Sequence, residues 1–236
     1  SSVTVDVHGK VLACATNSEI HAFDLAAGQS AFVHSDAHAE PISTLHFHPR
    51  RHKEIISGGD DGLLCALDTA RCGPSAGHGS SRDEFDAGLR LVINNDEGVR
   101  FFRLIGENSD LICAISNAEV MQLWSLHEKR PGALCGRYAN LRSDANLQCG
   151  ESDGYIVDVL YDKVSGCAHV LAGSVDGKLS FFHLNLEGAH HIGNLEWGHS
   201  QVVRAAAGLG KQFVTGAEDG TICVWNHRPL ITATSE

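Results

Sequence analysis

The chain has 236 residues, of which 43% are hydrophobic, and a formal net charge of -11 from eighteen basic and twenty-nine acidic side chains. This acidic balance argues against an extended phosphate-binding surface, because nucleic-acid affinity depends on cationic contacts to the backbone. The sequence shows no apolar run long enough to cross a bilayer and no basic-then-apolar leader, so we expect an intracellular protein of the cytoplasm or nucleus, with a basic or neutral partner.

Short apolar runs separated by turn residues fill the first third of the chain. Because the chain begins at Ser1 without a methionine and enters a strand-like segment at once, we expect a fragment or a processed chain. SSVTVDV, KVLACATN and SEIHAFDL predict three strands of a meander, and QSAFVHSDAH follows as a fourth run. A second set then begins with ISTLHFHP, EIISGG and LLCALDT, and its last run follows the turn Asp60-Asp61-Gly62.

Three further sets follow. An insertion at residues 70–88, rich in glycine, serine and charge, precedes LRLVINND, which we expect to be the outermost strand of the second set. The third set is VRFFRLIG, LICAIS and EVMQLWSL, and an irregular insertion at residues 127–153 follows it. The fourth is YIVDVLYD, AHVLAGS and KLSFFHL, and the fifth is VVRAAAG, QFVTGA and TICVWN. No stretch predicts a long helix, which indicates an all-β fold.

The spacing of the sets indicates a repeat. The last large apolar residues of the third strands are Phe23, Leu67, Trp124, Phe182 and Trp225, at separations of 44, 57, 58 and 43 residues. A period of roughly 40 to 45 residues with four short strands per unit is typical of propeller blades, and the two longer separations contain the insertions. We therefore predict a single domain with blades at about residues 1–38, 39–96, 97–153, 154–198 and 199–236.

These sets resemble WD40 repeats. In that family a hydrogen-bonded tetrad of histidine, hydroxyl, aspartate and tryptophan holds the outer loop of a blade, and the fifth set supplies it as His199, Thr215, Asp219 and Trp225. The second set keeps three of the four members, and Leu67 replaces the tryptophan; those three are His38, Ser57 and Asp61. The resemblance implies a structural role for all seven residues.

The other sets keep less of the tetrad. The third has Trp124 with Ala114 and Ala118, and the fourth has Asp176 with Ala172 and Phe182. No Trp-Asp dipeptide occurs in the chain. We therefore expect a divergent propeller that is held mainly by apolar packing.

A narrower resemblance covers most of residues 36–226. HFHP, the Ser-Gly-x-x-Asp-Gly turn and the segments LYDKVSGCAHVLAGSVDGKLSFFHLN and GHSQVVRAAAGLGKQFVTGAEDGTICVWN are similar to the eukaryotic WD repeat-containing protein 89 group. That resemblance implies a seven-bladed ring, of which these sets would be the carboxyl-terminal five, and no enzymatic activity. The alternative is a five-bladed ring that closes by itself.

Catalytic and metal sites are less well supported by the sequence. AAAGLGKQF lacks the first glycine and the Ser or Thr of a phosphate loop, and His38, Ser57 and Asp61 have the residue types of a hydrolytic triad but occupy tetrad positions. A histidine-rich stretch in the second set is the best metal candidate, although no carboxylate or thiol at ligand spacing completes it; its members are His34, His38, His46, His48 and His52. We predict no metal and no cofactor, and a metal or hydrolytic site in this second repeat is the alternative.

The loops around a propeller channel usually bind its partner. By the WD40 resemblance, the contacting positions follow each tetrad histidine or precede each turn aspartate, and here they are Glu40, Asp60, Gln201 and Glu218. Each of them could equally be an ordinary solvated residue. We predict a scaffold that binds a peptide or protein through these rim loops, within a larger complex and without membrane binding; the basic stretch HPRRHK at residues 48–53 is the one candidate for phosphate contact.

Overall fold

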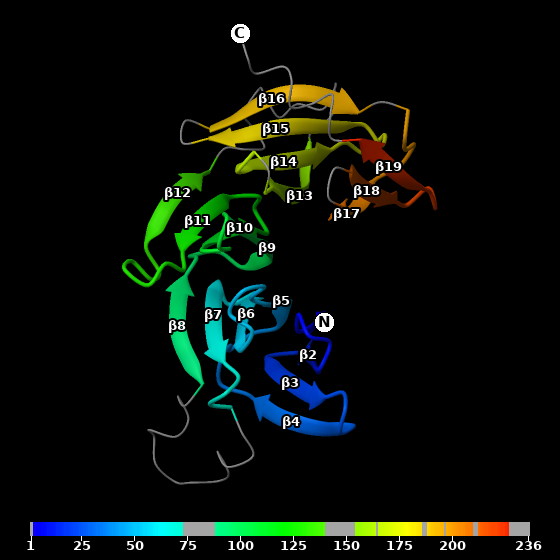
Figure 1. Ribbon diagram of the computed structural model, residues 1–236. Coiled ribbons are helices and arrows are strands. Elements are labelled where there is room, and N and C mark those ends of the chain that lie inside the picture. The colour runs from blue at the N-terminus through cyan, green and yellow to red at the C-terminus, as the bar shows by residue number, and fades with distance from the viewer. Residues whose placement is uncertain are drawn as a thin grey trace. The chain divides into compact units, whose positions relative to one another are not determined.

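The computed structural model describes residues 2–72, 88–139, 154–163, 165–185, 188–195, 197–209 and 212–226, and these ranges contain five antiparallel sheets (Figure 1). The chain divides into two units, which are described separately. Unit 1 comprises Ser1–Leu104 and Asn108–Arg137, and unit 2 comprises Ile105–Glu107 and Tyr138–Glu236. In the described part of the chain no helix is long and apolar enough to span a membrane.

Three sheets belong to unit 1. Sheet 1 contains β1 (Val3–Val5), β2 (Val11–Thr16), β3 (Glu19–Asp24) and β4 (Gln29–His34). Sheet 2 contains β5 (Ile42–Phe47), β6 (Glu54–Gly59), β7 (Leu63–Asp68) and β8 (Leu89–Asn94). Sheet 3 contains β9 (Val99–Ile105), β10 (Leu111–Ser116), β11 (Met121–Ser125) and β12 (Leu134–Tyr138).

Unit 2 holds the other two sheets. Sheet 4 contains β13 (Tyr155–Asp162), β14 (Cys167–Gly173), β15 (Leu179–Asn185) and β16 (Gly188–Leu195). The described part of sheet 5 contains β17 (Val203–Leu209), β18 (Gln212–Ala217) and β19 (Ile222–Asn226). Neighbours in each sheet are consecutive in sequence, which confirms the all-β, meander-type fold class. The division into one domain with five numbered blades stays a prediction.

One prediction about an insertion is wrong in part. Residues 127–153 were expected to be irregular, but Leu134–Tyr138 form β12, the outer strand of sheet 3. The sequence LCGRY lacks an alternating apolar pattern because this edge strand is largely exposed and its side chains need not pack on a core. Residues 73–87 and 140–153, which make up most of both insertions, lie outside the described residues.

The core of unit 1 lies between successive sheets. All six residues of β6 are buried, because sheet 2 packs against sheet 1 on one face and sheet 3 on the other. Ile55 joins the cluster with Ala13, Ile20 and Leu45, whereas its neighbour Ile56 joins the cluster with Phe102 and Trp124 in the next sheet. Adjacent residues of a strand point to opposite faces, so two consecutive isoleucines stabilise two different interfaces.

The core of unit 2 lies between sheets 4 and 5. Leu171, Phe181 and Phe213 are fully buried in one cluster, and the ring centroids of Phe181 and Phe213 lie 5.1 Å apart. Trp225 of β19 stacks on Phe213 at 6.2 Å and belongs to the partly buried edge of this cluster. Aromatic packing therefore joins the best-conserved copy of the repeat motif to its neighbouring sheet.

The tight turns between second and third strands share one backbone feature. Gly62, Gly177 and Gly220 have φ values of +76°, +83° and +78°, and each directly follows a turn aspartate. In sheet 3 the corresponding residue is Glu119, with φ +63°, and its carboxylate accepts a 2.9 Å hydrogen bond from Arg100. Only glycine adopts this conformation without steric cost, so the charged contact helps to hold a strained turn in place.

Candidate functional site

A buried hydrogen-bond chain fixes the loop before β5. The Ser57 hydroxyl lies 2.8 Å from His38 Nε2, and His38 Nδ1 lies 3.0 Å from Asp61 Oδ1. A consistent assignment has the Ser57 hydroxyl donating to Nε2 and the Nδ1–H donating to the carboxylate. A Cβ at position 59 would lie 2.6 Å from His38 Nδ1, so only Gly59 allows this approach. The network links the β4–β5 loop to the β6–β7 turn.

Sheet 5 contains a longer version of the same chain. Trp225 Nε1 donates to Thr215 Oγ1 at 2.7 Å, and Thr215 Oγ1 lies 2.6 Å from His199 Nε2. Asp219 stands 3.7 Å from His199 Nδ1, and Thr221 bridges them with contacts of 2.8 Å to the histidine and 2.6 Å to the carboxylate. All four predicted residues meet, but a threonine that the sequence analysis did not consider connects two of them.

Sheet 3 has an unpredicted substitute for the histidine. Trp124 Nε1 donates to Asn95 Oδ1 at 2.9 Å, and Asn95 is fully buried. Asn95 precedes the first residue of β9 by four positions, as His38 precedes β5 and His199 precedes β17. The position of Asn95 could therefore have been predicted from its four-residue offset from the strand, although its residue type differs from histidine.

Among the described residues of sheet 4, the turn aspartate keeps a local contact. Asp176 forms a 2.8 Å ion pair with Lys178 and accepts a hydrogen bond from the Ser174 hydroxyl. These two interactions lower the pKa of Asp176 to about 2, and the contribution of Lys178 is the larger. Ala172 and Phe182 are buried in the neighbouring strands β14 and β15, and neither side chain has a polar atom. At these two positions apolar packing replaces the hydroxyl and the indole of the tetrad, in agreement with a divergent repeat.

The turn carboxylates are held in their charged form. Burial alone would raise the pKa of Asp61, but hydrogen bonds from His38 and from the backbone amides of Leu63 and Ala39 outweigh it and lower the pKa. Hydrogen bonds from the Thr221 side chain and from the amides of Ser200 and Thr221 lower the pKa of Asp219. Both carboxylates therefore act as fixed acceptors for loop amides at neutral pH.

The networks position two predicted rim residues in unit 1. Glu40 and Asp60 are exposed, and within the described ranges no basic side chain lies within ion-pair distance of either. Asp60 is in the turn that ends β6, directly beside the loop that precedes β9. A Cβ added to Gly98 of that loop would lie 2.9 Å from the Asp60 carbonyl oxygen and 3.0 Å from Asn117 Nδ2. The Asp60 main chain and the Asn117 side chain therefore both pack against Gly98, and sequence reasoning did not identify Asn117.

The rim residues of unit 2 have a different environment. Gln201 and Glu218 are exposed, but Glu218 accepts a 2.7 Å hydrogen bond from Arg204 Nε. The Glu218 charge is therefore balanced within the sheet. Val175, which is 63% exposed, precedes the turn aspartate of sheet 4 at the position that Glu218 has in sheet 5. Two of the four predicted rim residues belong to unit 1 and two to unit 2, so each pair is considered within its own unit.

The histidine-rich stretch has separate environments. His46 packs edge-on against Phe102 at 5.1 Å, and burial, assisted by Arg103, lowers its pKa to about 4. His48 is buried and its Nε2 lies 3.0 Å from the Ser109 carbonyl. In the described part of the chain no three His, Cys, Asp or Glu residues are grouped as a metal site would require. The cysteines in that part are free thiols.

Comparisons with known proteins agree with this geometry. Residues 192–226 match the family model described as WD40, WD domain, G-beta repeat. The chain is 23% identical over 202 residues to the WD repeat-containing protein GTS1 of Arabidopsis thaliana, covering 80% of this chain and 48% of that protein. It thus spans about half the length of the relative it matches.

A solved structure shows the same fold. The chain superposes on a chain in the crystal structure of a mitotic checkpoint complex with a TM-score of 0.66 and 16% sequence identity, covering 95% of this chain and 60% of the other. The narrower resemblance to the WD repeat-containing protein 89 group stays a prediction. The fold is therefore that of a WD40-type β-propeller, and residues 192–226 are similar to the WD40 repeat family.

Proposed function

We propose that this chain is a non-enzymatic scaffold whose unit 1 rim binds a basic segment of a protein partner. The unit 1 rim is the exposed set Glu40, Asp60 and Asn117. The observation that carries the proposal is the position of Asp60, which is exposed beside Asn117 and has no basic neighbour within ion-pair distance in the described ranges. An unbalanced carboxylate on a fixed turn offers an acceptor to an incoming lysine or arginine.

The partner is proposed to be a protein within a larger assembly. WD repeats in general serve as interaction scaffolds, and the checkpoint-complex chain with the same fold belongs to a multi-protein assembly. The net charge of -11 favours a basic protein over nucleic acid or an anionic membrane. We also propose, on the resemblance alone, that the five sheets are the carboxyl-terminal five blades of a seven-bladed ring. An intracellular location, expected from the sequence, stays a proposal as well.

A hydrolytic function has a specific geometric argument against it. Ser57, His38 and Asp61 have triad-like spacing, at 2.8 Å and 3.0 Å, but Ser57 is fully buried and His38 is 5% exposed. A nucleophile must reach the substrate carbonyl, and no substrate atom reaches a hydroxyl enclosed in this way. The three residues support the loop that carries Glu40 and the turn that carries Asp60.

The test is affinity capture with the complete protein, followed by cross-linking mass spectrometry. The proposal expects a protein recovered near one-to-one stoichiometry, with cross-links to residues within about 10 Å of the unit 1 rim and a salt-sensitive affinity. Recovery of nucleic acid alone, or cross-links confined to unit 2, would contradict it.

A further inference from the structure

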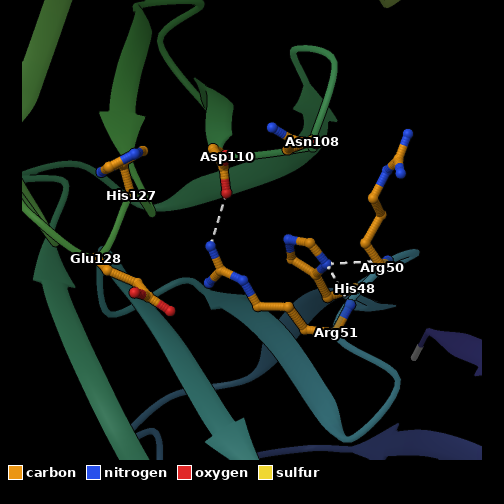
Figure 2. Close-up of a pocket in the computed structure, with 7 residues that line it drawn as sticks. All are labelled: His48, Arg50, Arg51, Asn108, Asp110, His127 and Glu128. Carbon is orange, nitrogen blue, oxygen red and sulfur yellow. Dashed lines mark hydrogen bonds and ion pairs between the residues drawn. The ribbon is translucent and has the colours of Figure 1, made fainter.

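Three turns at one end of sheets 2 and 3 line an open cavity of about 300 Å³ in unit 1 (Figure 2). The β5–β6 turn contributes His48, Arg50 and Arg51, and the β9–β10 and β11–β12 turns contribute the rest: Asn108, Asp110, His127 and Glu128. In an antiparallel meander these turns lie at the strand ends opposite the β4–β5 loop and the β6–β7 turn. The cavity is therefore separate from Glu40 and Asp60.

The floor of the cavity is fixed by Arg51. Its guanidinium donates to Asp110 Oδ1 at 2.7 Å, to the Leu126 carbonyl at 2.9 Å and to Glu54 Oε1 at 3.1 Å. These acceptors come from three different segments, and Figure 2 shows the Arg51 side chain reaching across to Asp110. Such a network holds the floor in one geometry before any ligand arrives.

His48 fixes the turn that carries Arg50. Its Nδ1 accepts the backbone N–H groups of Arg50 and Arg51 at 3.2 Å and 3.0 Å, and its Nε2–H donates to the Ser109 carbonyl at 3.0 Å. Burial, assisted by the nearby Arg51 cation, lowers the pKa of His48. The ring is therefore neutral at pH 7 and positions the arginine turn, while the positive charge comes from the arginines.

The three turns around the cavity carry a net positive charge in an acidic chain. Arg51 is already balanced by Asp110 and Glu54, so the remaining charged groups of these turns decide the local charge. They are four cations and two carboxylates: Arg50, Lys53, Lys129, Arg130, Glu107 and Glu128. Within the described residues none of these four cations has an ion-pair partner, and Figure 2 shows Arg50 extending away from the Arg51–Asp110 pair.

Two further side-chain donors complete the lining. His127 Nδ1 accepts the Lys129 backbone N–H at 3.2 Å, so Nε2 carries the ring N–H that can donate, and the Asn108 amide adds a further donor. A volume near 300 Å³ is at the lower end of ligand pockets and suits one side chain with its terminal group. We propose that this cavity binds the oxyanion of an acidic peptide side chain, either a carboxylate or a phosphate ester, with Arg50 as the principal ligand contact.

The test uses three fluorescein-labelled probes and the complete protein: a Gly-Ser peptide with three central glutamates, the same peptide with phosphoserines, and an oligouridylate of equal length. Saturable binding of either peptide is expected, and the two peptide arms distinguish carboxylate from phosphate. Arg50→Glu should weaken binding by about tenfold or more, because it replaces a charge-assisted contact with a repulsive one. Arg50 is exposed, so the variant should fold, which circular dichroism checks.

Three further variants sharpen the result. Lys163→Glu makes the same charge change at an exposed position of unit 2 and should leave binding unchanged, whereas Glu128→Gln should strengthen it about twofold. Asp60→Asn should have no effect here, which separates this site from the rim. Absence of saturable peptide binding, equal binding by Arg50→Glu, or saturable binding of the oligouridylate alone would overturn the proposal.

Discussion

Trp124 of β11 donates its indole N–H to the Oδ1 of Asn95, 29 residues earlier, at 2.9 Å in the core of unit 1. Asn95 thus satisfies the tryptophan in a sheet that lacks the histidine and the hydroxyl residue of the tetrad. The repeat keeps the function of the network, which is to tie the loop to the third strand, although its chemical groups have changed.

Asn95→Leu is predicted to destabilise the protein by about 1–3 kcal/mol, because the buried Trp124 N–H loses its acceptor. Trp124→Phe should also destabilise it, and the double variant should be less destabilised than the two single variants together. Urea titrations of the four proteins measure the coupling. Strict additivity would show that the two side chains do not depend on each other.

The turn glycines give a matched pair. Gly177 and Gly220 both have φ near +80°, but a Cβ at Gly177 would lie 2.6 Å from the His199 backbone carbon, whereas Gly220 has no atom within 4 Å. Gly220→Ala should cost about 1 kcal/mol from backbone strain alone. Gly177→Ala should cost clearly more, since the loop before β17 must shift as well. Equal losses of unfolding free energy would contradict the packing of this turn on that loop.

Stability should fall in mild acid because of His46. Its folded-state pKa of about 4 lies below the unfolded value of about 6.5, so the unfolded chain binds more protons between these values. This contribution is complete above about pH 6.5 and is lost as the pH falls toward 4, with about 2 kcal/mol lost by pH 5.

His46→Gln serves as the comparison for this prediction, because glutamine does not titrate and can still accept from Arg103. Unfolding free energies at about pH 7.5 and pH 5 should differ less for the variant than for the wild type. If the unfolding free energies of both proteins fall by the same amount between these two pH values, the pKa of His46 is not lowered as its burial indicates.

Ser57 should be unreactive. A fluorophosphonate probe, which labels activated serines, is expected to leave Ser57 unmodified in the folded protein because the hydroxyl is fully buried. Ser57→Ala should lower the unfolding free energy by about 1–3 kcal/mol through loss of the His38 contact. Peptide mapping by mass spectrometry decides the question, and stoichiometric labelling at Ser57 would revive the hydrolytic alternative.

Strong periodic features were predictable from the sequence. Alternating apolar runs and Asp-Gly turns marked the second and third strands of most sheets, since burial against a neighbouring sheet imposes a period of two. β12 was not predicted because it is an exposed edge strand, whose side chains need not alternate between apolar and polar. The networks at His38 and His199 were also predictable in composition, since their residue types recur at fixed offsets.

Contacts that depend on side-chain geometry were less predictable. Asp61 reaches His38 directly because the residue two positions later is Leu63, whereas Thr221 occupies that position in sheet 5 and bridges Asp219 to His199. Likewise, the basic stretch at residues 48–53 was predicted only as a candidate for phosphate contact, without a cavity. The cavity depends on turns that lie about 60 and 80 residues further along the chain, which spacing alone does not bring together.

The most direct measurement compares Asp60→Asn with Glu218→Gln in binding to the captured partner. Both variants remove one negative charge at the same turn position, but Arg204 already balances Glu218, whereas no basic side chain in the described ranges balances Asp60. Isothermal titration should show the Kd rising about tenfold for Asp60→Asn and less than about twofold for Glu218→Gln. An unchanged Kd for Asp60→Asn, or a larger loss for Glu218→Gln, would contradict a partner site at the unit 1 rim.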